Sequence, residues 1–425
     1  MEKRARPVAA APSDGGARFG TGGLAGLLAA ASDRRGGALT VYLLFAAVCC
    51  FLSLGAVPLI SMEAMVADAG AAMIESGGWA VPTLYGEMFT FKPALAPWMS
   101  AVAQSAAERP GELLLRLPFA LCGALLGLAL LLLVGRRHGW RVGLFTGLAA
   151  VGSALFVEKV RIAEYDAPLA AAVGVAVAAA ALNLAGRREL LSLWCLAYTG
   201  VAAGFVAKGA PALMVFGPGL VAAALLAGRP RRLAGWRHLA GGALGLLLIG
   251  GYLWWAWRSG GPQVFDQPLR EAQVRGLRWG AAELLAIAVK PATTFSVLLP
   301  WSFALLLWRP FRRSASEDGL RLARAGAGFL LGGLAAFALL PASQPRYVLP
   351  LAGPLALVAG PIVATLLESR LPRWAVAATR VLFLLGAAAT LGAAAGRGTP
   401  SRPLRLTRVA RLSGAALAGR APAGT

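Results

Sequence analysis

The chain has 425 residues, of which 58% are hydrophobic and only 14% are charged. A soluble domain is about 45–50% apolar and about 25% charged, so this composition excludes an ordinary soluble protein and indicates a membrane protein. The net charge of +22 would favour nucleic-acid binding in a soluble chain, but here the basic residues form short clusters between apolar runs and no nucleic-acid motif is present.

Residues 1–37 are rich in Gly, Ala and Arg and lack a compact apolar run with a cleavage site. We therefore predict a disordered cytoplasmic tail with a short helix at Leu24–Ala31, and no signal peptide. The transmembrane domain is predicted to cover residues 38–395, and residues 396–425 form a basic C-terminal tail.

Apolar runs long enough to cross a bilayer predict an all-α integral membrane protein with about eleven transmembrane helices. The runs are Leu39–Leu59, Leu117–Val134, Val142–Phe156, Pro168–Leu184, Leu190–Val206, Ala210–Leu226, Leu239–Trp257, Leu285–Trp308, Ala325–Leu340, Val348–Leu367 and Ala375–Ala395. The third run is short, which predicts a tilted or broken helix.

Arginine clusters occupy alternate loops, and the positive-inside rule places that side in the cytoplasm together with the N-terminus. The opposite, outer side holds the longest loops, residues 60–116 among them, and most of the carboxylates. The basic C-terminal tail falls on the outer side by this count and breaks the pattern. The four cysteines lie within apolar runs and the two histidines in basic loops, so neither residue type predicts a metal or catalytic site.

The first outer loop begins with Glu63 near the end of the first span and continues through Phe91-Lys92-Pro93. Its first part predicts an amphipathic helix at the membrane interface, with Met65, Ala69, Ala72 and Met73 on the apolar face. Such helices are suited to shaping a cavity reached from lipid. The alternative is an anchored loop whose charges are simply solvated.

Three further segments place charges on the same outer side. Asp166 stands at the entrance of the fourth span, either as a functional acid or as an acid favoured by the helix dipole. Lys208 joins two apolar helices, and Arg346 precedes Tyr347 between the ninth and tenth spans. Both cations could bind a phosphate, or could extend to the interface as ordinary membrane-flanking residues.

The combination of outer carboxylates and cations suits a lipid substrate that carries a phosphate. Cations hold the phosphate and stabilise it as a leaving group, while a carboxylate activates an acceptor hydroxyl or orients a divalent ion. No nucleotide-binding loop is present, so we predict no nucleotide cofactor.

Four stretches, in this order, resemble the GT-C glycosyltransferases that use polyprenyl-phosphate sugars, in particular the bacterial aminoarabinose transferases and protein O-mannosyltransferases. They are Glu63–Trp98, Arg161–Asp166, Ala207–Gly209 and Ser343–Leu351, the last followed by Gly353–Leu357. The similarity extends from Val41 to Leu366. It implies a GT-C bundle with periplasmic amphipathic helices in the first outer loop and a polyprenyl-phosphate donor.

The resemblance also implies roles for individual residues. Glu63 and Asp166 match the family's outer acidic positions, which are catalytic and, where Mg or Mn is used, linked to the metal. Lys92, Lys208 and Arg346 would hold the donor phosphate, with Tyr347 lining the donor site. The family's usual Asp-Glu pair reads Met62-Glu63 here, and Phe91 stands where the lipid A branch often has Glu. These departures weaken the case for strict metal dependence and for aminoarabinose as the sugar.

The sequence therefore predicts a bacterial inner-membrane enzyme with a periplasmic active site, transferring a hexose or pentose from a polyprenyl phosphate. The acceptor would be lipid A, another glycolipid, a polysaccharide or a protein, and anionic membrane lipids are further partners. Two alternatives stay open. One is a transporter or flippase for a lipid-linked sugar, although no internal repeat supports it. The other is a catalytically inactive member of the family, motivated by Met62.

Overall fold

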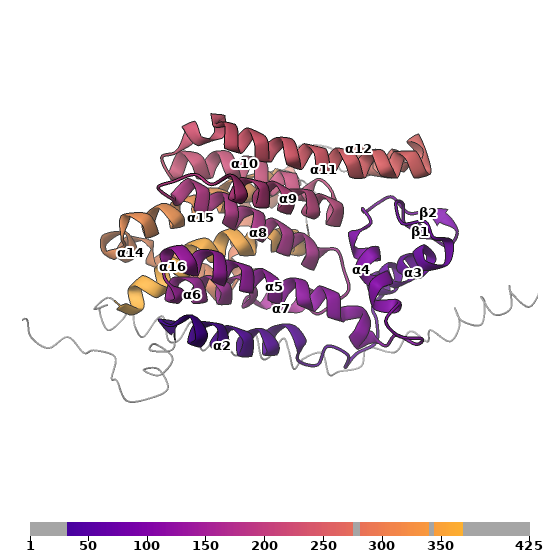
Figure 1. Cartoon of the computed structure of the whole chain (residues 1–425), viewed down its shortest axis with the longest axis horizontal. Coiled ribbons are helices and arrows are strands. Elements are labelled where there is room, and N and C mark those ends of the chain that lie inside the picture. The colour runs from indigo at the N-terminus through magenta and orange to yellow at the C-terminus, as the bar shows by residue number, and fades with distance from the viewer. Residues whose placement is uncertain (1–31, 275–280, 340–343, 369–425) are drawn as a thin grey trace, which may run out of the picture.

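The computed structural model describes residues 32–274, 281–339 and 344–368. Within these ranges the protein is a bundle of roughly parallel and antiparallel helices, with a small module at one end that holds a two-stranded hairpin (Figure 1). Helices α11 and α12 border one side of the bundle and α2 borders the other (Figure 1).

The elements follow one another along the chain with short connections. They are α2 Arg35–Ala46, η1 Ala47–Phe51, α3 Ser61–Ser76, β1 Thr83–Leu84, β2 Glu87–Met88, α4 Leu95–Gln104, α5 Glu112–His138, α6 Trp140–Val151, α7 Ala154–Val160, α8 Asp166–Ala185, α9 Leu191–Lys208, α10 Pro211–Leu226, η2 Pro230–Ala234, α11 Trp236–Gly260, η3 Pro262–Phe265, α12 Asp266–Val274, α13 Ala281–Val297, η4 Trp301–Leu307, α14 Trp308–Ser314, α15 Glu317–Ala338, η5 Pro345–Leu351 and α16 Ala352–Glu368.

Six of the described helical segments are long and apolar enough to cross a membrane, or up to eight if each of two bent pairs is one span. The six are Glu112–His138, Asp166–Ala185, Leu191–Lys208, Trp236–Gly260, Glu317–Ala338 and Pro345–Leu367. Arg35–Phe51 and Pro211–Leu226 are shorter apolar helices that the sequence also predicted as spans. The multi-pass, predominantly helical architecture is confirmed, whereas the number of about eleven spans is not.

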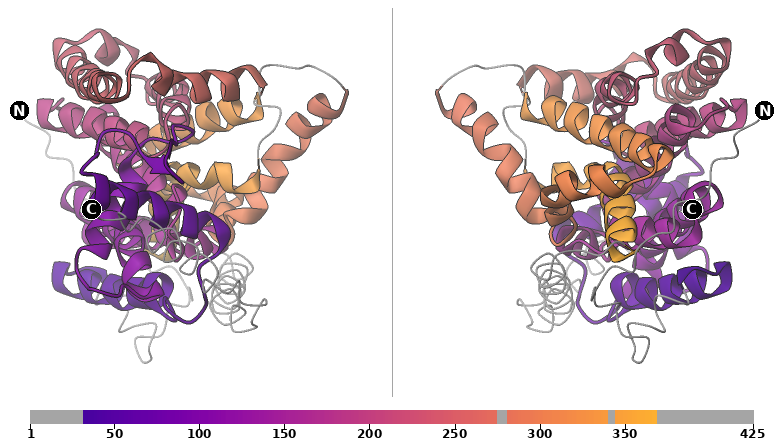
Figure 2. Two further views of the ribbon diagram at one scale, coloured as in Figure 1. Left: turned by 90° about the vertical axis from the view of Figure 1, so that its right-hand side faces the viewer. Right: turned by 90° about the vertical axis from the view of Figure 1, so that its left-hand side faces the viewer.

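The two bent pairs explain part of this difference. The predicted third span is broken as expected: α6 and α7 meet at 68° around Gly152. The predicted helix Leu285–Trp308 is wrong as one continuous element, because Val289–Val297 and Trp301–Ser314 meet at 114°. Pro300 lies in the break, and its ring and missing N–H prevent an uninterrupted helix. Figure 2 shows α13 slanting along one side of the bundle.

The ends of several predicted elements also shift. The first helix begins at Arg35, within the predicted tail, and ends with η1 at Phe51, eight residues short of the predicted Leu59. The chain leaves helical geometry there, and Ser53 has a positive φ of 56°. Helix α5 begins at Glu112 rather than Leu117, and α15 begins at Glu317 rather than Ala325. The predicted elements Leu24–Ala31 and Ala375–Ala395 and the C-terminal tail lie outside the described residues.

Helix α8 forms the centre of the bundle. It packs against α5, α9, α10, α15 and α16, and almost all of its residues are buried. Its sequence is rich in alanine, which lets neighbouring backbones approach closely. At Gly174, the facing Gly353 comes so near that a Cβ on Gly353 would lie 2.7 Å from the Gly174 Cα. The middle of α8 is therefore tightly packed against α16.

The segment between α2 and α5 folds into the module at one end of the bundle (Figure 1), which we call the outer-loop module, residues 60–111. Helices α3 and α4 pack on each other, and a Cβ on Gly70 would lie 2.9 Å from the backbone nitrogen of Ala101. Ala69 and Met73, predicted to face the membrane interface, are instead fully buried. The apolar face of α3 therefore serves mainly to pack the module, not to bind lipid.

Candidate active site

The candidate site lies where the outer-loop module meets the helix bundle. Asp166 is the first residue of α8, and Lys208 is the last residue of α9. The Lys208 ammonium donates to Oδ1 of Asp166 and lies 4.9 Å from the ring centroid of Tyr347, which belongs to η5. The structure thus brings together three residues that the sequence predicted separately.

A second ion pair flanks Tyr347. Arg346 donates from Nη1 to Oε2 of Glu164 at 3.3 Å, and its guanidinium carbon lies 6.0 Å from the Tyr347 ring. Glu164 is almost fully buried, and the side chain of Arg346 is 26% exposed. The Nε of Arg346 is buried and has no hydrogen-bond partner in the part of the chain that the structure describes. This guanidinium therefore retains hydrogen-bonding capacity for an anion.

Glu164 is a titratable group that the sequence analysis assigned no role. Burial raises the pKa of its carboxyl above 4.5, and the negative charge of Asp166 acts in the same direction. Lys159 and Arg346 lower the pKa in opposition. A perturbed acid in a cluster of charges is typical of a functional site.

Glu63 occupies a different position, at the base of the outer-loop module. Its carboxylate is fully buried and accepts from Nε and Nη2 of Arg116, each at 2.7 Å. Oε2 also accepts from the backbone nitrogen of Ile60 at 3.0 Å, and Oε1 accepts from that of Ala163 at 2.8 Å. Each oxygen of Glu63 therefore accepts two hydrogen bonds.

Arg116 completes this arrangement. Its Nη1 donates to the carbonyls of Leu54 and Val57, and its Nη2 donates to that of Pro58. The pair therefore fastens α3 to α5, to the connection after η1, and to the loop that carries Glu164 and leads into Asp166. For Glu63 to accept a proton, its ion pair with Arg116 would have to break, at a considerable cost in a buried site.

Lys92, the remaining predicted cation, lies between β2 and α4. The next residue, Pro93, faces the turn after Lys208, where its Cγ lies 3.9 Å from the position of a Cβ on Gly209. The backbone nitrogen of Ala94 donates to the Tyr252 hydroxyl at 3.1 Å. Lys92 therefore belongs to a segment anchored next to the α9–α10 turn, beside Lys208.

Sequence reasoning missed Arg116 and Glu164. Arg116 follows three leucines at the start of an apolar helix, and a cation in such a run requires a buried partner, so a signal was present. Glu164 has no comparable signal, because it lies in a short stretch with Glu158, Lys159, Arg161 and Asp166. Only the fold shows which of these charges turns towards Arg346.

The predicted metal site does not fit the described side chains. Both oxygens of Glu63 are bound to Arg116 and backbone N–H groups, and Asp166 is bound to Lys208. No cluster of three or more His, Cys, Asp or Glu suited to a metal ion exists within residues 32–274, 281–339 and 344–368. A divalent cation would have to compete with protein cations for both carboxylates, and no reaction step is derived through it.

Comparison with known proteins identifies what the chain is similar to. The sequence model of the dolichyl-phosphate-mannose-protein mannosyltransferases matches residues 91–255, which include Lys92, Asp166 and Lys208. No curated protein matches the chain significantly.

Solved structures share the fold. ArnT from Cupriavidus metallidurans, bound to undecaprenyl phosphate, matches with a TM-score of 0.63 and 21% identity over 78% of this chain and 60% of that one. The archaeal oligosaccharyltransferase AglB from Archaeoglobus fulgidus, in complex with an inhibitory peptide and a dolichol-phosphate, matches with a TM-score of 0.56 and 13% identity, covering 91% of this chain and 58% of that one. The chain thus spans about 60% of the length of these structures.

These comparisons confirm the predicted resemblance to the GT-C glycosyltransferases. They also confirm the fold class, a helical membrane bundle, and the multi-pass membrane character of the chain.

Proposed function

We propose that the chain is a membrane glycosyltransferase that moves one sugar from a polyprenyl phosphate to an acceptor on the outer side of the bacterial inner membrane. The observation that carries this proposal is the convergence of Lys208 and Arg346 on the ring of Tyr347, at the start of the central helix α8. The family match and the polyprenyl phosphates bound in the two similar structures support it.

The donor phosphate would bind between the two cations. Lys208 and Arg346 are each held by one carboxylate. A phosphate oxygen that binds beside Tyr347 would therefore replace Asp166 and Glu164 as the partner of these two cations. The buried Nε of Arg346 supplies a donor that no described residue uses. Lys92 adds a third positive charge from the outer-loop module.

In the proposed reaction the acceptor hydroxyl oxygen attacks the anomeric carbon of the donor sugar. A new carbon–oxygen bond forms with inversion as the bond from that carbon to the phosphate oxygen breaks. The polyprenyl phosphate leaves with the electron pair, and the cations stabilise its added charge. Asp166 accepts the proton of the hydroxyl, for which its contact with Lys208 must yield as Lys208 turns to the phosphate.

The orientation in the membrane is part of the proposal. Arg136, Arg137, Arg187 and Arg188 lie at the end of the bundle away from the outer-loop module, as the α5–α6 and α8–α9 connections in Figure 1 show. The basic α10–α11 connection lies at the same end. By the positive-inside rule that end faces the cytoplasm, which puts the N-terminus there and the candidate site in the periplasm.

Glu63 keeps a place in the proposal, but as a positioning residue. Its bond to the Ala163 N–H holds the loop that carries Glu164 and leads to Asp166. The role of Glu63 as base or metal ligand stays a prediction, and the ion pair with Arg116 favours the structural role.

The test is transfer of labelled sugar from a panel of polyprenyl-phosphate sugars in membranes that contain matched amounts of wild type, Asp166→Asn or Glu158→Gln. Glu158 is a half-exposed carboxylate on neighbouring α7 and serves as the matched control. We expect transfer by wild type and by the control, and a loss of at least about a hundredfold in Asp166→Asn. Folded wild-type protein that transfers sugar from no donor would overturn the proposal and favour an inactive family member.

A further inference from the structure

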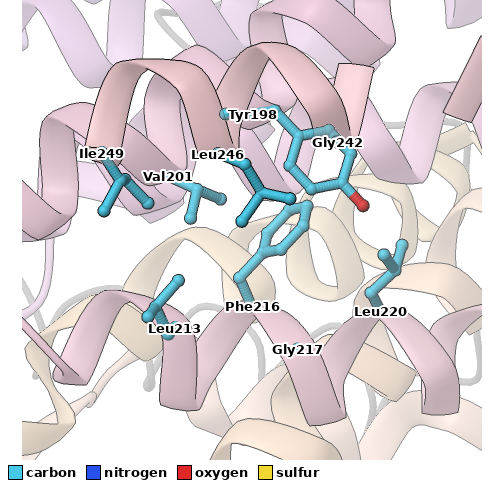
Figure 3. Close-up of a pocket in the computed structure, with 10 residues that line it drawn as sticks. Tyr198, Val201, Leu213, Phe216, Gly217, Leu220, Gly242, Leu246 and Ile249 are labelled. Atoms are coloured by element: carbon cyan, nitrogen blue, oxygen red, sulfur yellow. The ribbon is translucent and has the colours of Figure 1, made fainter. Parts of the chain in front are cut away.

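A groove between α10 and α11 lies apart from the candidate active site. It has a volume of about 240 Å³ and an almost entirely apolar lining. Figure 3 shows Leu213, Phe216 and Leu220 on one wall and Leu246 and Ile249 on the other, with Tyr198 at one end. Leu213 and Leu246 are 43% and 75% exposed, so the groove opens to the side of the bundle rather than into its core.

The chain itself closes one end of this groove. The connection from α10 to α11 contains η2, which packs on both helices that form the walls. The Tyr198 hydroxyl, at the groove's end, shares a 2.5 Å hydrogen bond with Nε2 of His238, in the first turn of α11, and Nδ1 of His238 is 2.7 Å from the carbonyl oxygen of Leu233. The polar end of the groove therefore adjoins this connection.

That connection is strongly basic. It carries Arg229, Arg231 and Arg232 and no acidic residue. Arg232 donates to the carbonyls of Asn183 and Arg187 and so fastens the connection to the bundle. Neither Arg229 nor Arg231 forms an ion pair with any carboxylate of the described residues. Two cations are thus available where the groove ends.

We propose that this groove binds an anionic phospholipid, with one acyl chain between α10 and α11 and the headgroup phosphate on Arg229 and Arg231. From the start of α11 to Ile249 the helix rises by roughly 20 Å, which matches the depth of one leaflet, about 15 Å of hydrocarbon plus the interface. Basic pockets between helices at the cytoplasmic surface are suited to anionic headgroups.

The segment that follows α16 is a poorer occupant. Residues 369–425 lie outside the described ranges and contain no Asp or Glu, so they could not neutralise Arg229 and Arg231. A phospholipid supplies both the apolar chain and the negative charge. The headgroup position is distinct from the donor site, because the basic connection that carries Arg229 and Arg231 follows the end of α10, whereas Lys208 precedes its start.

Glycines provide a test that leaves the fold intact. A Cβ on Gly242 would meet only the Tyr198 ring, at 3.8 Å, so Gly242→Leu should fill the groove without displacing backbone. Gly251, on the same helix, has nothing within 4 Å of its Cβ position and does not line the groove. Gly251→Leu is therefore a control with the same chemical change and the same gain in helix propensity.

The experiment uses full-length protein purified from nanodiscs of phosphatidylglycerol and phosphatidylcholine, with bound lipid counted by native mass spectrometry. We expect wild type and Gly251→Leu to retain one phosphatidylglycerol with a preference over phosphatidylcholine of roughly thirtyfold, from about 1 kcal/mol for each of the two arginines. Gly242→Leu should lose this lipid, and Arg229→Gln/Arg231→Gln should lose the preference. Glycerol phosphate without acyl chains should not compete.

Three results would overturn the proposal. The first is equal retention of both lipids by wild type. The second is unchanged retention of phosphatidylglycerol by a correctly folded Gly242→Leu. The third is that a chain shortened after Glu368 retains the lipid whereas the chain with residues 369–425 releases it. The last result would assign the groove to the C-terminal segment. Unfolding temperatures of all variants show that each compared protein is folded.

Discussion

Arg116 and Glu63, 53 residues apart in the chain, form a buried two-pronged ion pair in which both N–O distances are 2.7 Å. The side chains are 1% and 0% exposed. Through Ala163 the pair is also connected to the loop that precedes Asp166, so one ion pair links the outer-loop module to the candidate site.

Replacing Glu63 by Gln should destabilise the protein by about 3–5 kcal/mol, because the charge of Arg116 would remain buried without its partner. Denaturant unfolding in detergent micelles measures this change. The double variant Glu63→Gln/Arg116→Met should recover much of the loss, since it removes both charges. If Glu63 were instead the catalytic base, the double variant would regain stability with no regain of transfer activity.

Lys208→Met should weaken binding of polyprenyl phosphate by about tenfold or more, because one charge-assisted contact to the phosphate is lost. Lys208→Arg should retain part of the affinity, since the charge remains near Tyr347. Equilibrium binding of a fluorescent polyprenyl phosphate to protein in nanodiscs measures both. Affinity that is unchanged in Lys208→Met would exclude this lysine from the donor site.

Tyr347→Phe should leave donor binding close to that of wild type, whereas Tyr347→Ala should reduce it by about threefold to tenfold. The Lys208 ammonium lies 4.9 Å from the centroid of the Tyr347 ring and the Arg346 guanidinium carbon lies 6.0 Å from it, so the aromatic ring should carry most of the effect. The same binding assay checks the difference. A large loss in Tyr347→Phe would show that the hydroxyl itself contacts the donor.

The pH dependence of the protein's stability should reveal the raised pKa of Glu164. Burial raises the pKa of this carboxyl above 4.5, so between that value and its folded pKa the folded protein binds more protons than the unfolded chain. The contribution of Glu164 to stability is therefore greatest at or below about pH 4.5 and declines as the pH rises through the folded pKa. Thermal unfolding measured across this pH range should show that the unfolding temperature of wild type declines as the pH rises. The decline should be smaller in Glu164→Gln.

The affinity for the polyprenyl-phosphate donor should also depend on the protonation of Glu164. Protonation of Glu164 releases Arg346 for the phosphate, so lowering the pH through the pKa of Glu164 should tighten binding. The phosphate also loses charge near its own pKa of about 6, which acts in the opposite direction. Because Glu164→Gln retains only the phosphate effect, the difference between the two pH profiles isolates the carboxyl. Parallel profiles would contradict the assignment.

Chelation of divalent metals should leave sugar transfer unchanged, since the carboxylates of Glu63 and Asp166 are engaged by Arg116 and Lys208. Transfer assays with and without EDTA measure this. Met62→Asp, which restores the family's usual Asp-Glu pair, provides the comparison. If only this variant requires a metal, Met62 is the reason why the wild type does not. Inhibition of wild type by EDTA, reversed by Mg or Mn, would contradict the prediction.

The sequence predicted the long apolar helices well, because hydropathy alone determines them. Helices α5 and α8 each contain the apolar run expected there, and α9 begins one residue after the start of its run. Bends were harder to predict: the short third run indicated the break at Gly152, but Leu285–Trp308 holds two prolines, and only Pro300 coincides with the turn of 114°, whereas Pro291 lies inside α13. Hydropathy measures transfer into lipid and is insensitive to where a helix changes direction.

The sequence predicted most of the residues of the candidate site but not which of them form ion pairs with each other. Asp166, Lys208, Arg346 and Tyr347 lie together as the outer-side grouping suggested, yet their partners arise from packing between distant helices. Lys208 meets Asp166 across 42 positions, and Arg346 meets Glu164 across 182. Pairings at such separations depend on the tertiary fold, which a single sequence does not display.

The central position of α8 has a consequence for biogenesis. The helix emerges from the ribosome well before α15 and α16, which later surround it and join η5, with Arg346 and Tyr347, to its first turn. Until those helices are inserted, the Glu164 carboxylate lacks Arg346 beside it, whereas Asp166 can already pair with Lys208 at the end of α9. Nascent chains that stall before η5 should therefore hold a half-assembled bundle in which Glu164 lacks its ion-pair partner, and the candidate site would be complete only once η5 has been inserted.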